Sequence, residues 1–279
     1  MSLIELKNVS YRYPLEAELA IDGVSVTIEK GKVYGMIGNN QSGKTTLCNI
    51  IRGFIPEMFL GDLTGDVFYK GKSVASYNIG AFAAEIGYSS QNPFTQISGV
   101  KDTVEEEIAY GMENIGIPLE RMNETIPKLI ELFHLEELKA KNPYELSGGQ
   151  KQRVALASIV ALDPEVIILD EPTSQLDPQS TEEVFKIISM LKKRGKTIIV
   201  VEHKVDLLAE FCDEIILMEK GQIVEFGPAH KVLSDPRILA HGGSLPQVSE
   251  FFITHLHEKG AIPITMSQAI KKLKGAEAT

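Results

Sequence analysis

One short stretch, residues 38–45, constrains the fold of this chain more than any other part of its sequence. It reads G-N-N-Q-S-G-K-T, which matches the pattern G-x-x-x-x-G-K-[ST], and it lies between an apolar run at 33–37 and a helical pattern at 46–54. Glycine lets the backbone curl so that several N–H groups point inward at a helix N-terminus, where they favour an anion. The pattern therefore predicts a strand, a phosphate-binding loop and a helix in succession.

Two side chains of this loop have the chemistry that a nucleoside triphosphate requires. Lys44 is expected to reach the β- and γ-phosphates, and the Thr45 hydroxyl is placed to bind Mg²⁺. The alternative is an ordinary glycine-rich turn, which the strand–loop–helix context disfavours. The predicted nucleotide-binding residues of the loop are Gly38, Asn39, Asn40, Gln41, Ser42, Gly43, Lys44, Thr45 and Thr46.

Short apolar runs alternate with longer helical patterns along the chain, which is typical of an α/β fold with a largely parallel sheet. The runs at 33–37, 166–169 and 197–201 predict buried parallel strands. Residues 3–9 and 23–28 instead alternate between apolar and polar side chains, so antiparallel strands are expected there. The predicted fold class is therefore α/β with an antiparallel β subdomain.

A helical block separates these predicted strands. Helical spacing occurs at 103–112, 119–133 and 136–141, and we expect a helical insertion over about residues 95–162. Residues 101–145 hold eleven acidic and five basic side chains. This acidic excess accounts for more than half of the chain's net charge of −10. The insertion is therefore expected to be acidic.

The pattern changes again near the C-terminus. Residues 247–257 place their apolar side chains on one helical face, and residues 265–268 have capping-box spacing ahead of a last short helix. The expected division is a main domain over residues 1–228 and a small C-terminal subdomain over residues 229–279.

Composition excludes several classes of protein. A net charge of −10 argues against sequence-independent binding to nucleic acid, whose phosphates require a basic face. No apolar stretch approaches the roughly 20 residues of a membrane span, and the first residues lack the regions of a signal peptide. Two cysteines are too few for a disulfide framework or a four-ligand zinc site. These features predict a cytosolic protein.

Two consecutive acids, Asp170 and Glu171, follow the apolar run at 166–169. α/β folds present their ligand sites at the carboxyl ends of such strands. Asp170 is expected to hold Mg²⁺, directly or through water, and Glu171 to polarise the attacking water. The alternative is a hydrated strand end, which is disfavoured because Mg²⁺·ATP at the predicted loop needs a carboxylate facing its phosphates.

A second anion site is predicted at 146–150, which read L-S-G-G-Q and open a helical pattern at 151–162. Ser147 and the backbone N–H groups of Gly148 and Gly149 lie at this predicted helix N-terminus. If both loops serve one γ-phosphate, a single subunit must fold them onto each other. If they face opposite ways, two subunits must pair head-to-tail around two ATP molecules. The residues alone leave both arrangements open.

With these motifs in this order, residues 3–230 resemble the ATP-binding subunits of ABC transporters. The resemblance implies a P-loop NTPase (RecA-like) core that hydrolyses ATP with Mg²⁺. It also implies a head-to-tail dimer, in which each ATP lies between the Lys44 loop of one subunit and the Ser147 loop of the other.

The resemblance also implies roles for individual residues. Tyr13 corresponds to an aromatic residue that stacks on adenine, with Tyr11 as its competitor. Asp177 corresponds to a loop that crosses the dimer interface, and His203 to a histidine that contacts the γ-phosphate. The implied catalytic set is Glu171, His203, Gln91 and Lys44; the metal set is Thr45, Gln91 and Asp170; and nucleotide contacts extend to Tyr13, Ser147, Gly148, Gly149, Gln150 and Asp177.

Residues 91–97 and 103–114 narrow the resemblance to the energy-coupling factor (ECF) subfamily. This implies a short extra helix after Gln91 and a C-terminal subdomain at the dimer interface. It also implies uptake of a vitamin or a transition-metal ion beneath a transmembrane T component and a substrate-binding S component, with the chain peripheral at the cytoplasmic face of the membrane. T components carry arginines on their coupling helices, which suits an acidic insertion. A conventional ABC importer or exporter and a non-transport regulatory module are the alternatives.

Three residues depart from the family pattern. Gln41 stands where glycine is common, and a non-glycine residue costs about 1 kcal/mol if the backbone there needs a positive φ. Gln175 stands where glycine or alanine is usual, and Lys204 replaces an aspartate after His203. No catalytic group is lost, but the departures leave open whether both ATP sites of a dimer turn over equally.

Overall fold

The computed structural model describes residues 2–92, 95–258 and 260–276 of the chain. The chain divides into two compact units. The first unit comprises residues 1–79 and 201–279, and the second comprises residues 80–200.

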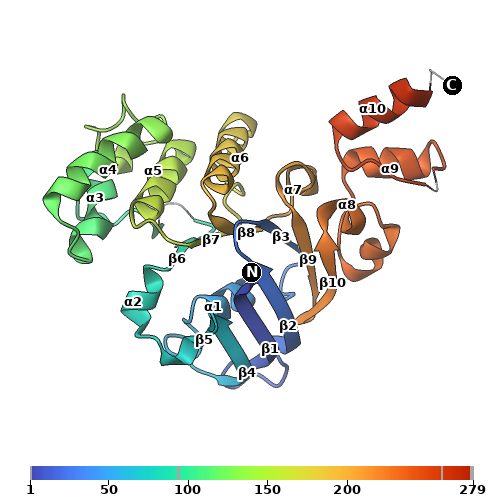
Figure 1. The fold of residues 1–279 in the computed structure, drawn as a ribbon, viewed down its shortest axis with the longest axis horizontal. Coiled ribbons are helices and arrows are strands. Elements are labelled where there is room, and N and C mark those ends of the chain that lie inside the picture. Colours follow the sequence, from blue (N-terminus) through green and yellow to red (C-terminus); the bar gives the residue numbers. More distant parts are fainter. Residues whose placement is uncertain (1, 93–94, 259, 277–279) are drawn as a thin grey trace. The chain divides into compact units, whose positions relative to one another are not determined.

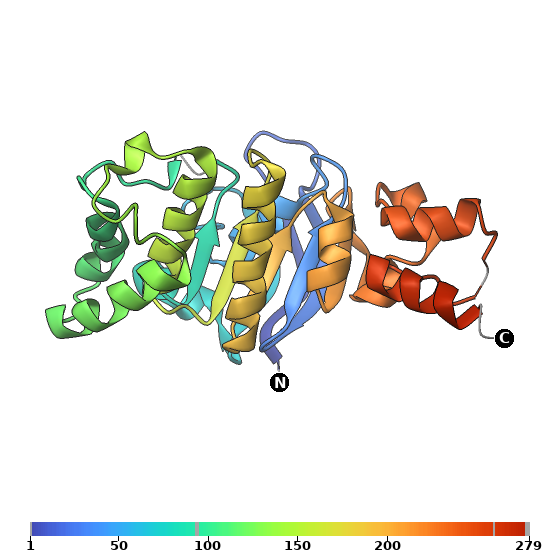
Figure 2. The ribbon, with the colours of Figure 1, turned by 90° about the horizontal axis from the view of Figure 1, so that it is seen from above.

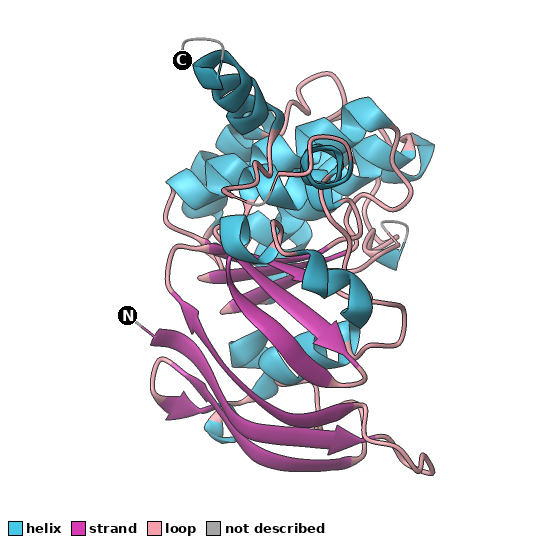
Figure 3. Ribbon diagram, turned by 90° about the vertical axis from the view of Figure 1, so that its right-hand side faces the viewer, coloured by secondary structure: helices cyan, strands magenta, loops and turns pink. Residues whose placement is uncertain are grey.

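An antiparallel sheet forms one part of the first unit (Figures 1 and 3). Its strands are β1 (Ser2–Arg12), β2 (Ile21–Glu29), β4 (Asp62–Tyr69) and β5 (Lys72–Ser73), in the order β2-β1-β4-β5, and the 3-10 turn η1 (Val74–Ser76) follows β5. Along β2, Val24, Val26 and Ile28 are buried while the residues between them are exposed. The alternation near the N-terminus therefore correctly predicted antiparallel strands, although the sequence analysis did not identify β4.

The phosphate-loop segment of the first unit also has the predicted order. The strand β3 (Val33–Ile37) is buried throughout, and the helix α1 (Lys44–Ile51) begins after residues 38–43. β3 pairs in parallel with β9 (Glu214–Glu219), which pairs antiparallel with β10 (Gln222–Pro228). The loop thus connects a fully buried strand to a helix whose residues are mostly buried, so both of its ends are fixed.

Short helices make up the C-terminal part of the first unit. They are α7 (Val205–Phe211), α8 (Ala229–Val232), the 3-10 helix η4 (Pro236–His241), α9 (Gln247–Thr254) and α10 (Met266–Ala276). The Thr265 hydroxyl accepts the backbone N–H of Gln268 at 3.3 Å, as the capping-box spacing predicted. The buried Ser249 of α9 donates to the carbonyl of Pro263 at 2.9 Å, which ties α9 to the segment before α10. The two predicted C-terminal helices are therefore present, while the domain boundary at residue 228 stays a prediction.

The second unit contains the other predicted parallel strands. β6 (Ile86–Ser89), β7 (Val166–Asp170) and β8 (Thr197–Val201) lie in the order β8-β7-β6, with β6 and β7 parallel. The helix α2 (Ile79–Ala83) precedes β6, and α6 (Pro178–Lys193) connects β7 to β8. Across the described residues of the chain, no helix is both long enough and apolar enough to span a bilayer.

The predicted helical insertion is present in the second unit (Figure 2). Its elements are α3 (Val104–Asn114), α4 (Leu119–Leu132), the 3-10 turn η3 (Pro143–Glu145) and α5 (Gly148–Ala161), and the three α-helices pack on one another. A capping box between Thr103 and Glu106 begins α3.

One predicted helix, at 136–141, is wrong, because this segment forms turns. The backbone carbonyls of Lys139 and Lys141 accept the N–H groups of Glu105 and Val104 at 3.0 Å each. These carbonyls therefore satisfy the first turn of α3 instead of extending a helix of their own. The extra helix expected within 91–97 includes residues 93–94, which lie outside the described residues.

A buried carboxylate fixes the segment that leads into α3. Glu107 is 4% exposed, and its two carboxylate oxygens accept the backbone N–H and the hydroxyl of Ser98, both at 2.7 Å. Hydrogen bonds to a charged group contribute more to stability than neutral ones, although the exposed Ser98 can bond to water when they are lost.

We expect Glu107→Ala to lower the free energy of unfolding by about 1–3 kcal/mol, because two hydrogen bonds to the buried carboxylate are lost. Glu105→Ala, at an exposed position of the same helical turn, should change it by less than about 0.5 kcal/mol. Urea unfolding followed by circular dichroism measures both. Equal losses in the two variants would contradict this role of Glu107.

Candidate functional site

The phosphate loop is curled by three residues with positive φ. These are Gly38 at 141°, Gln41 at 65° and Gly43 at 102°. A Cβ at Gly43 would lie 2.7 Å from the carbonyl oxygen of Ala20, so the loop also needs a close backbone approach there. Gln41 therefore has the positive φ at which a non-glycine residue is strained, at a cost on the order of 1 kcal/mol.

Lys44 lies at the centre of this curl. The residue is 6% exposed. Its ammonium group donates to the carbonyl oxygens of Gly38 and Asn39 at 2.9 and 2.8 Å. The helix α1 that follows has no side-chain cap and no acidic residue in its first turn. A cation and an uncapped helix N-terminus at one place form an electrostatically suitable site for phosphate.

The structure distinguishes the two candidate tyrosines. Tyr11 is fully buried, and its hydroxyl donates to the carbonyl of Leu60 at 2.8 Å. Burial raises the pKa of the Tyr11 phenol, so it stays a protonated donor. Tyr11 is therefore committed to the core and is unavailable for stacking on a base.

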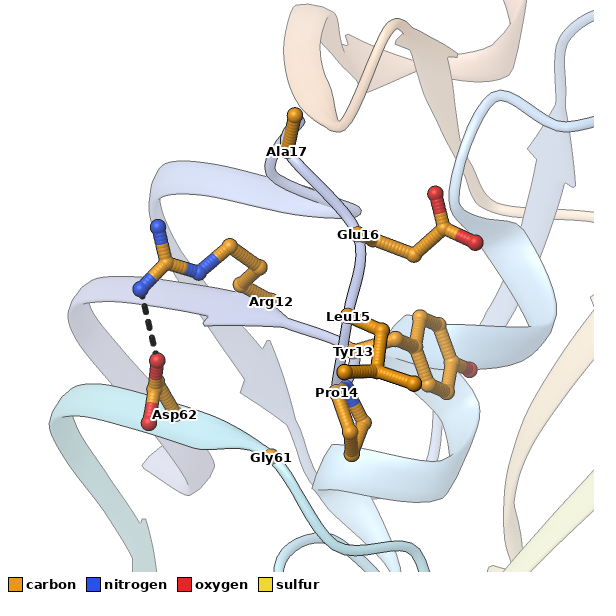
Figure 4. Close-up of a pocket in the computed structure, with 8 residues that line it drawn as sticks. All are labelled: Arg12, Tyr13, Pro14, Leu15, Glu16, Ala17, Gly61 and Asp62. Carbon is orange, nitrogen blue, oxygen red and sulfur yellow. Dashed lines mark hydrogen bonds and ion pairs between the residues drawn. The ribbon is translucent and has the colours of Figure 1, made fainter.

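Tyr13 instead lines an open pocket of about 550 Å³ (Figure 4). Its hydroxyl is 3.0 Å from the Thr46 hydroxyl of α1, and its ring meets that of Tyr11 edge-on, with centroids 4.8 Å apart. An ion pair between Arg12 and Asp62 at 2.7 Å borders the same pocket. Among the predicted nucleotide contacts, Tyr13 and Thr46 thus lie side by side.

His203 is held near the end of β3 through its neighbour. The buried Glu202 donates its backbone N–H to the carbonyl of Met36 at 3.3 Å, and its carboxylate accepts the N–H groups of His203 and Lys204 at 2.9 and 3.3 Å. Lys204 is the N-cap residue of α7 and provides no side-chain cap. The Glu202 carboxylate thus orders the backbone of His203 and Lys204, while the first turn of α7 has no side-chain cap. The imidazole of His203 is exposed.

In the second unit, the two predicted acids each have a specific partner. Asp170, 5% exposed at the end of β7, accepts the hydroxyl of Tyr88 at 3.0 Å. Glu171 accepts the side-chain N–H of Gln91 at 2.7 Å and has a φ of 50°. A non-glycine residue in the left-handed region costs on the order of 1–3 kcal/mol, and such strain concentrates at functional sites. The structure therefore brings together Gln91 and Glu171, two of the predicted catalytic residues.

The residues at 146–150 begin α5 as predicted. Ser147 and Gln150 form a capping box, in which the Ser147 hydroxyl accepts the N–H of Gln150 at 3.4 Å and Gln150 accepts that of Ser147 at 3.0 Å. The N–H groups of Gly148 and Gly149 lie in the first turn, which has no acidic residue. This geometry suits an anion at the helix N-terminus.

Gly149 also connects this helix to Asp177. A Cβ at Gly149 would lie 2.8 Å from Cβ of Ser180, so only glycine fits there. Ser180 donates its hydroxyl and its backbone N–H to Asp177 at 2.6 and 2.9 Å. These bonds lower the pKa of the Asp177 carboxyl below its usual range. The predicted interface residue Asp177 is thus one side chain away from the predicted second anion site.

The donor chemistry of the predicted metal set fits Mg²⁺. The hydroxyl of Thr45 and the carboxylate of Asp170 are hard oxygen donors, and Asp170 is oriented by Tyr88. No group of three or more His, Cys, Asp or Glu side chains in the described parts of the chain could hold a metal on its own. Mg²⁺ needs no such cage, because substrate phosphates and water complete its shell.

The family model described as ABC transporter matches residues 21–174, more than half of the chain. The chain belongs to the ABC transporter ATPase family. This ABC ATPase is 34% identical over 277 residues to the energy-coupling factor transporter ATP-binding protein EcfA of Methanocaldococcus jannaschii, and the alignment covers 98% of the chain and 96% of that protein. The recognition of an ABC ATPase of the ECF type is therefore confirmed.

Solved structures agree with this assignment. cbiO1 from Clostridium perfringens, described as part of the ABC transporter complex cbiONQ, matches with a TM-score of 0.77 and 25% identity over 92% of this chain and 96% of that one. The ATP-binding cassette MJ0796, solved as a dimer in a post-hydrolysis state with ADP and Pi, matches with a TM-score of 0.69 and 25% identity over 81% of this chain and 99% of that one. The predicted P-loop NTPase fold is thus confirmed.

Three contacts of this ABC ATPase were missed by the sequence analysis. Tyr88 bonds Asp170, Ser180 bonds Asp177, and Glu202 bonds the segment of His203. Tyr88, Ser180 and Glu202 each lie next to, or three residues from, a position that the sequence analysis predicted. The sequence did not show in which direction their side chains point. Asp177 and Ser180 do have the spacing of a helix N-cap and its N3 residue, which is a signal that could have paired them.

We expect Tyr13→Ala to raise the Kd for ATP about tenfold, because stacking on a base is worth on the order of 1–3 kcal/mol. Tyr13→Phe keeps the ring and loses only the Thr46 contact, so its Kd should change by less than about threefold. Isothermal titration calorimetry measures both values. Tyr11→Phe should lower thermal stability, because its bond to Leu60 is lost, without changing the Kd. An unchanged Kd in Tyr13→Ala would contradict stacking by Tyr13.

Proposed function

We propose that this chain is the ATP-binding and hydrolysing subunit of an ECF transporter, which powers uptake of a vitamin or a transition-metal ion. The observation that carries the proposal is the strained, hydrogen-bonded Glu171 directly after Asp170, because that geometry suits hydrolysis and not only nucleotide binding. The similarity to EcfA along nearly the whole chain supports the ECF assignment.

The proposed reaction gives each predicted catalytic residue a separate role. Lys44 leaves the carbonyls of Gly38 and Asn39 and binds the β- and γ-phosphates, and His203 contacts the γ-phosphate. Glu171 takes the proton of a water that attacks the γ-phosphorus, and the bond to the β-phosphate oxygen breaks to release ADP. Gln91, which donates to Glu171, orients that carboxylate toward the water.

Thr45, Gln91 and Asp170 would hold Mg²⁺. The ion neutralises charge that develops on the phosphate oxygens. Tyr88 restricts the Asp170 carboxylate to one orientation through its hydroxyl, and Tyr13 and Thr46 meet the nucleoside end of the substrate.

The second subunit supplies the other anion site. We propose a head-to-tail dimer, with an identical chain or a close relative, in which the phosphates at one Lys44 loop meet Ser147, Gly148, Gly149 and Gln150 of the partner, and Asp177 crosses the interface. ATP at both sites then favours the closed dimer. Shifting such an equilibrium from about 1:99 to 99:1 requires roughly 5.5 kcal/mol of differential affinity, which two phosphate sites with charge-assisted bonds supply.

The acidic insertion is the proposed contact with the membrane component. Of the acidic side chains in residues 101–145, only Glu107 is buried, so the others form an exposed negative surface on the helical block. Such a surface is complementary to arginines on a T component, and closure of the dimer would move it. The chain would therefore work as a peripheral subunit at the cytoplasmic face of the membrane.

The C-terminal helices are the proposed second dimer contact. Met266, Ile270 and Leu273 are 64, 47 and 47% exposed and follow one face of α10, and Phe251 of α9 is 48% exposed. Apolar side chains at this spacing suit burial against the same helices of the other subunit.

We expect Glu171→Gln to abolish ATP hydrolysis, with a loss of at least 10²-fold, while the Kd for ATP stays within about threefold. The amide cannot accept the proton of the attacking water but preserves the shape of the side chain. With Mg²⁺·ATP, the variant should elute as a dimer in size-exclusion chromatography. Phosphate release measures the turnover.

Glu210→Gln provides the matched control, because Glu210 is an exposed glutamate on α7. This control should hydrolyse ATP at the wild-type rate. Near-normal turnover in Glu171→Gln would contradict the assignment of the base, and normal binding without turnover in the wild-type protein would favour a regulatory module.

Purification of the tagged chain from its native membranes, followed by identification of the proteins that copurify, tests the transport assignment. An ECF complex should copurify with a T component and one small apolar subunit that carries the substrate. Copurification with transmembrane subunits alone would instead favour a conventional ABC importer or exporter.

A further inference from the structure

A glycine in the C-terminal part of the first unit lies against the phosphate loop. Gly242 ends the 3-10 helix η4 with a φ of 74°. A Cβ at this position would lie 2.5 Å from Cγ and 2.9 Å from Oδ1 of Asn39, and closer still to Nδ2. The turn after η4 therefore packs against the side chain of the second residue of the phosphate loop, and a side chain at position 242 would have to displace the Asn39 carboxamide.

Two further contacts close a ring around this pair. His241, next to Gly242, is 2.8 Å from the carboxylate of Glu219 at the end of β9. Met218, next to Glu219, places its carbonyl oxygen where a Cβ of Gly38 would stand, and Gly38 precedes Asn39. Three pairs of consecutive residues, from the loop, from β9 and from η4, thus hold one another in place.

This ring supports the atoms that hold Lys44. The carbonyl oxygen of Asn39 accepts the Lys44 ammonium at 2.8 Å and the backbone N–H of Ser42 at 3.2 Å, and the carbonyl of Gly38 accepts the ammonium at 2.9 Å. Asn39 thus contributes both the side chain that meets the Gly242 turn and one of the carbonyl oxygens that hold Lys44.

We propose that the Gly242 turn is a positioning element of the ATP site, which sets the affinity of the phosphate loop through Asn39 and couples nucleotide occupancy to the C-terminal helices. The proposal rests on the proposed role of residues 38–45 in binding the phosphates of ATP. Phosphates that draw Lys44 away from the Asn39 carbonyl would alter the position of Asn39, whose side chain the turn contacts. Linkage makes this coupling reciprocal: the factor by which bound ATP changes the stability of the packed turn is the factor by which the packed turn changes the affinity for ATP.

The test is a mutant cycle with a matched control. Gly242→Ala adds a Cβ that meets Asn39, and we expect it to raise the Kd for Mg²⁺·ATP about tenfold. Gly71→Ala adds a Cβ at a φ of 77° in the same unit with no atom within 4 Å, so it carries the backbone strain alone. Its Kd should stay within about twofold of the wild-type value. Equal shifts in the two variants would overturn the proposal.

Rescue separates positioning from general damage. Asn39→Ala removes Cγ, Oδ1 and Nδ2, so adding Gly242→Ala in that background should change the Kd by less than about twofold. A tenfold change in both backgrounds would overturn the proposal. Should Gly242→Ala fail to fold, His241→Ala releases the tie to Glu219 instead. It should raise the Kd about threefold in the wild-type background and leave it unchanged beside Asn39→Ala.

Hydrogen exchange tests the reverse direction. Mg²⁺·ATP should change the protection of the backbone amide of Gly243, which bonds the carbonyl of Ile238 at 2.9 Å, and should not do so in Lys44→Ala. No change in the wild-type protein would contradict the coupling. ATP affinity in Lys44→Ala equal to that of the wild type would contradict the proposed phosphate loop itself, so the two failures are distinguishable.

Discussion

The ammonium group of Lys44, held by two carbonyl oxygens of its own loop, is the interaction on which the site in the first unit depends. A cation this deeply buried needs partners, and the curl of residues 38–43 supplies them at 2.8 and 2.9 Å. The carbonyl dipoles of the loop satisfy part of the charge of the lysine. Phosphate oxygens carry full charges, so they would be stronger partners for the ammonium than these carbonyls.

Each unit contains a strained residue at a position predicted to be functional. Gln41 and Glu171 both have positive φ without being glycine. Such strain persists only where the surroundings determine the backbone more strongly than the residue does. At Gln41 those surroundings are the fully buried β3 and the mostly buried α1, and at Glu171 they are the buried β7 and the bond from Gln91. Strain located in this way maintains a geometry suited to the reaction at the expense of some stability.

The sequence was informative where a local pattern carries its own physical reason. The strands at 33–37, 166–169 and 197–201 were predictable because apolar runs of that length are buried in parallel sheets, and the phosphate loop because its spacing is specific. The helix at 136–141 was mispredicted because its carbonyls bond to α3, about 35 residues earlier in the chain, and no local pattern contains that information. The competition between Tyr11 and Tyr13 was undecidable for the same reason, since it depends on a bond from Tyr11 to Leu60. Gly242 gave no signal at all, because a single glycine in a loop matches no motif.

The departures from the family pattern share one property that bears on whether two ATP sites of a dimer are equivalent. Gln41, Gln175 and Lys204 all have exposed side chains. At two of the positions the structure fixes the backbone, because Gln41 takes the positive φ of a glycine and the Glu202 carboxylate accepts the N–H of Lys204. The segment of Gln175 approaches Gly148 through its main chain and not through the longer side chain. The carbonyl oxygen of Gln175 lies 3.8 Å from where a Cβ of Gly148 would stand. In the proposed dimer, we expect these exposed side chains to influence the two sites through what they meet on the partner subunit, so their effect should depend on whether that partner is identical or a relative.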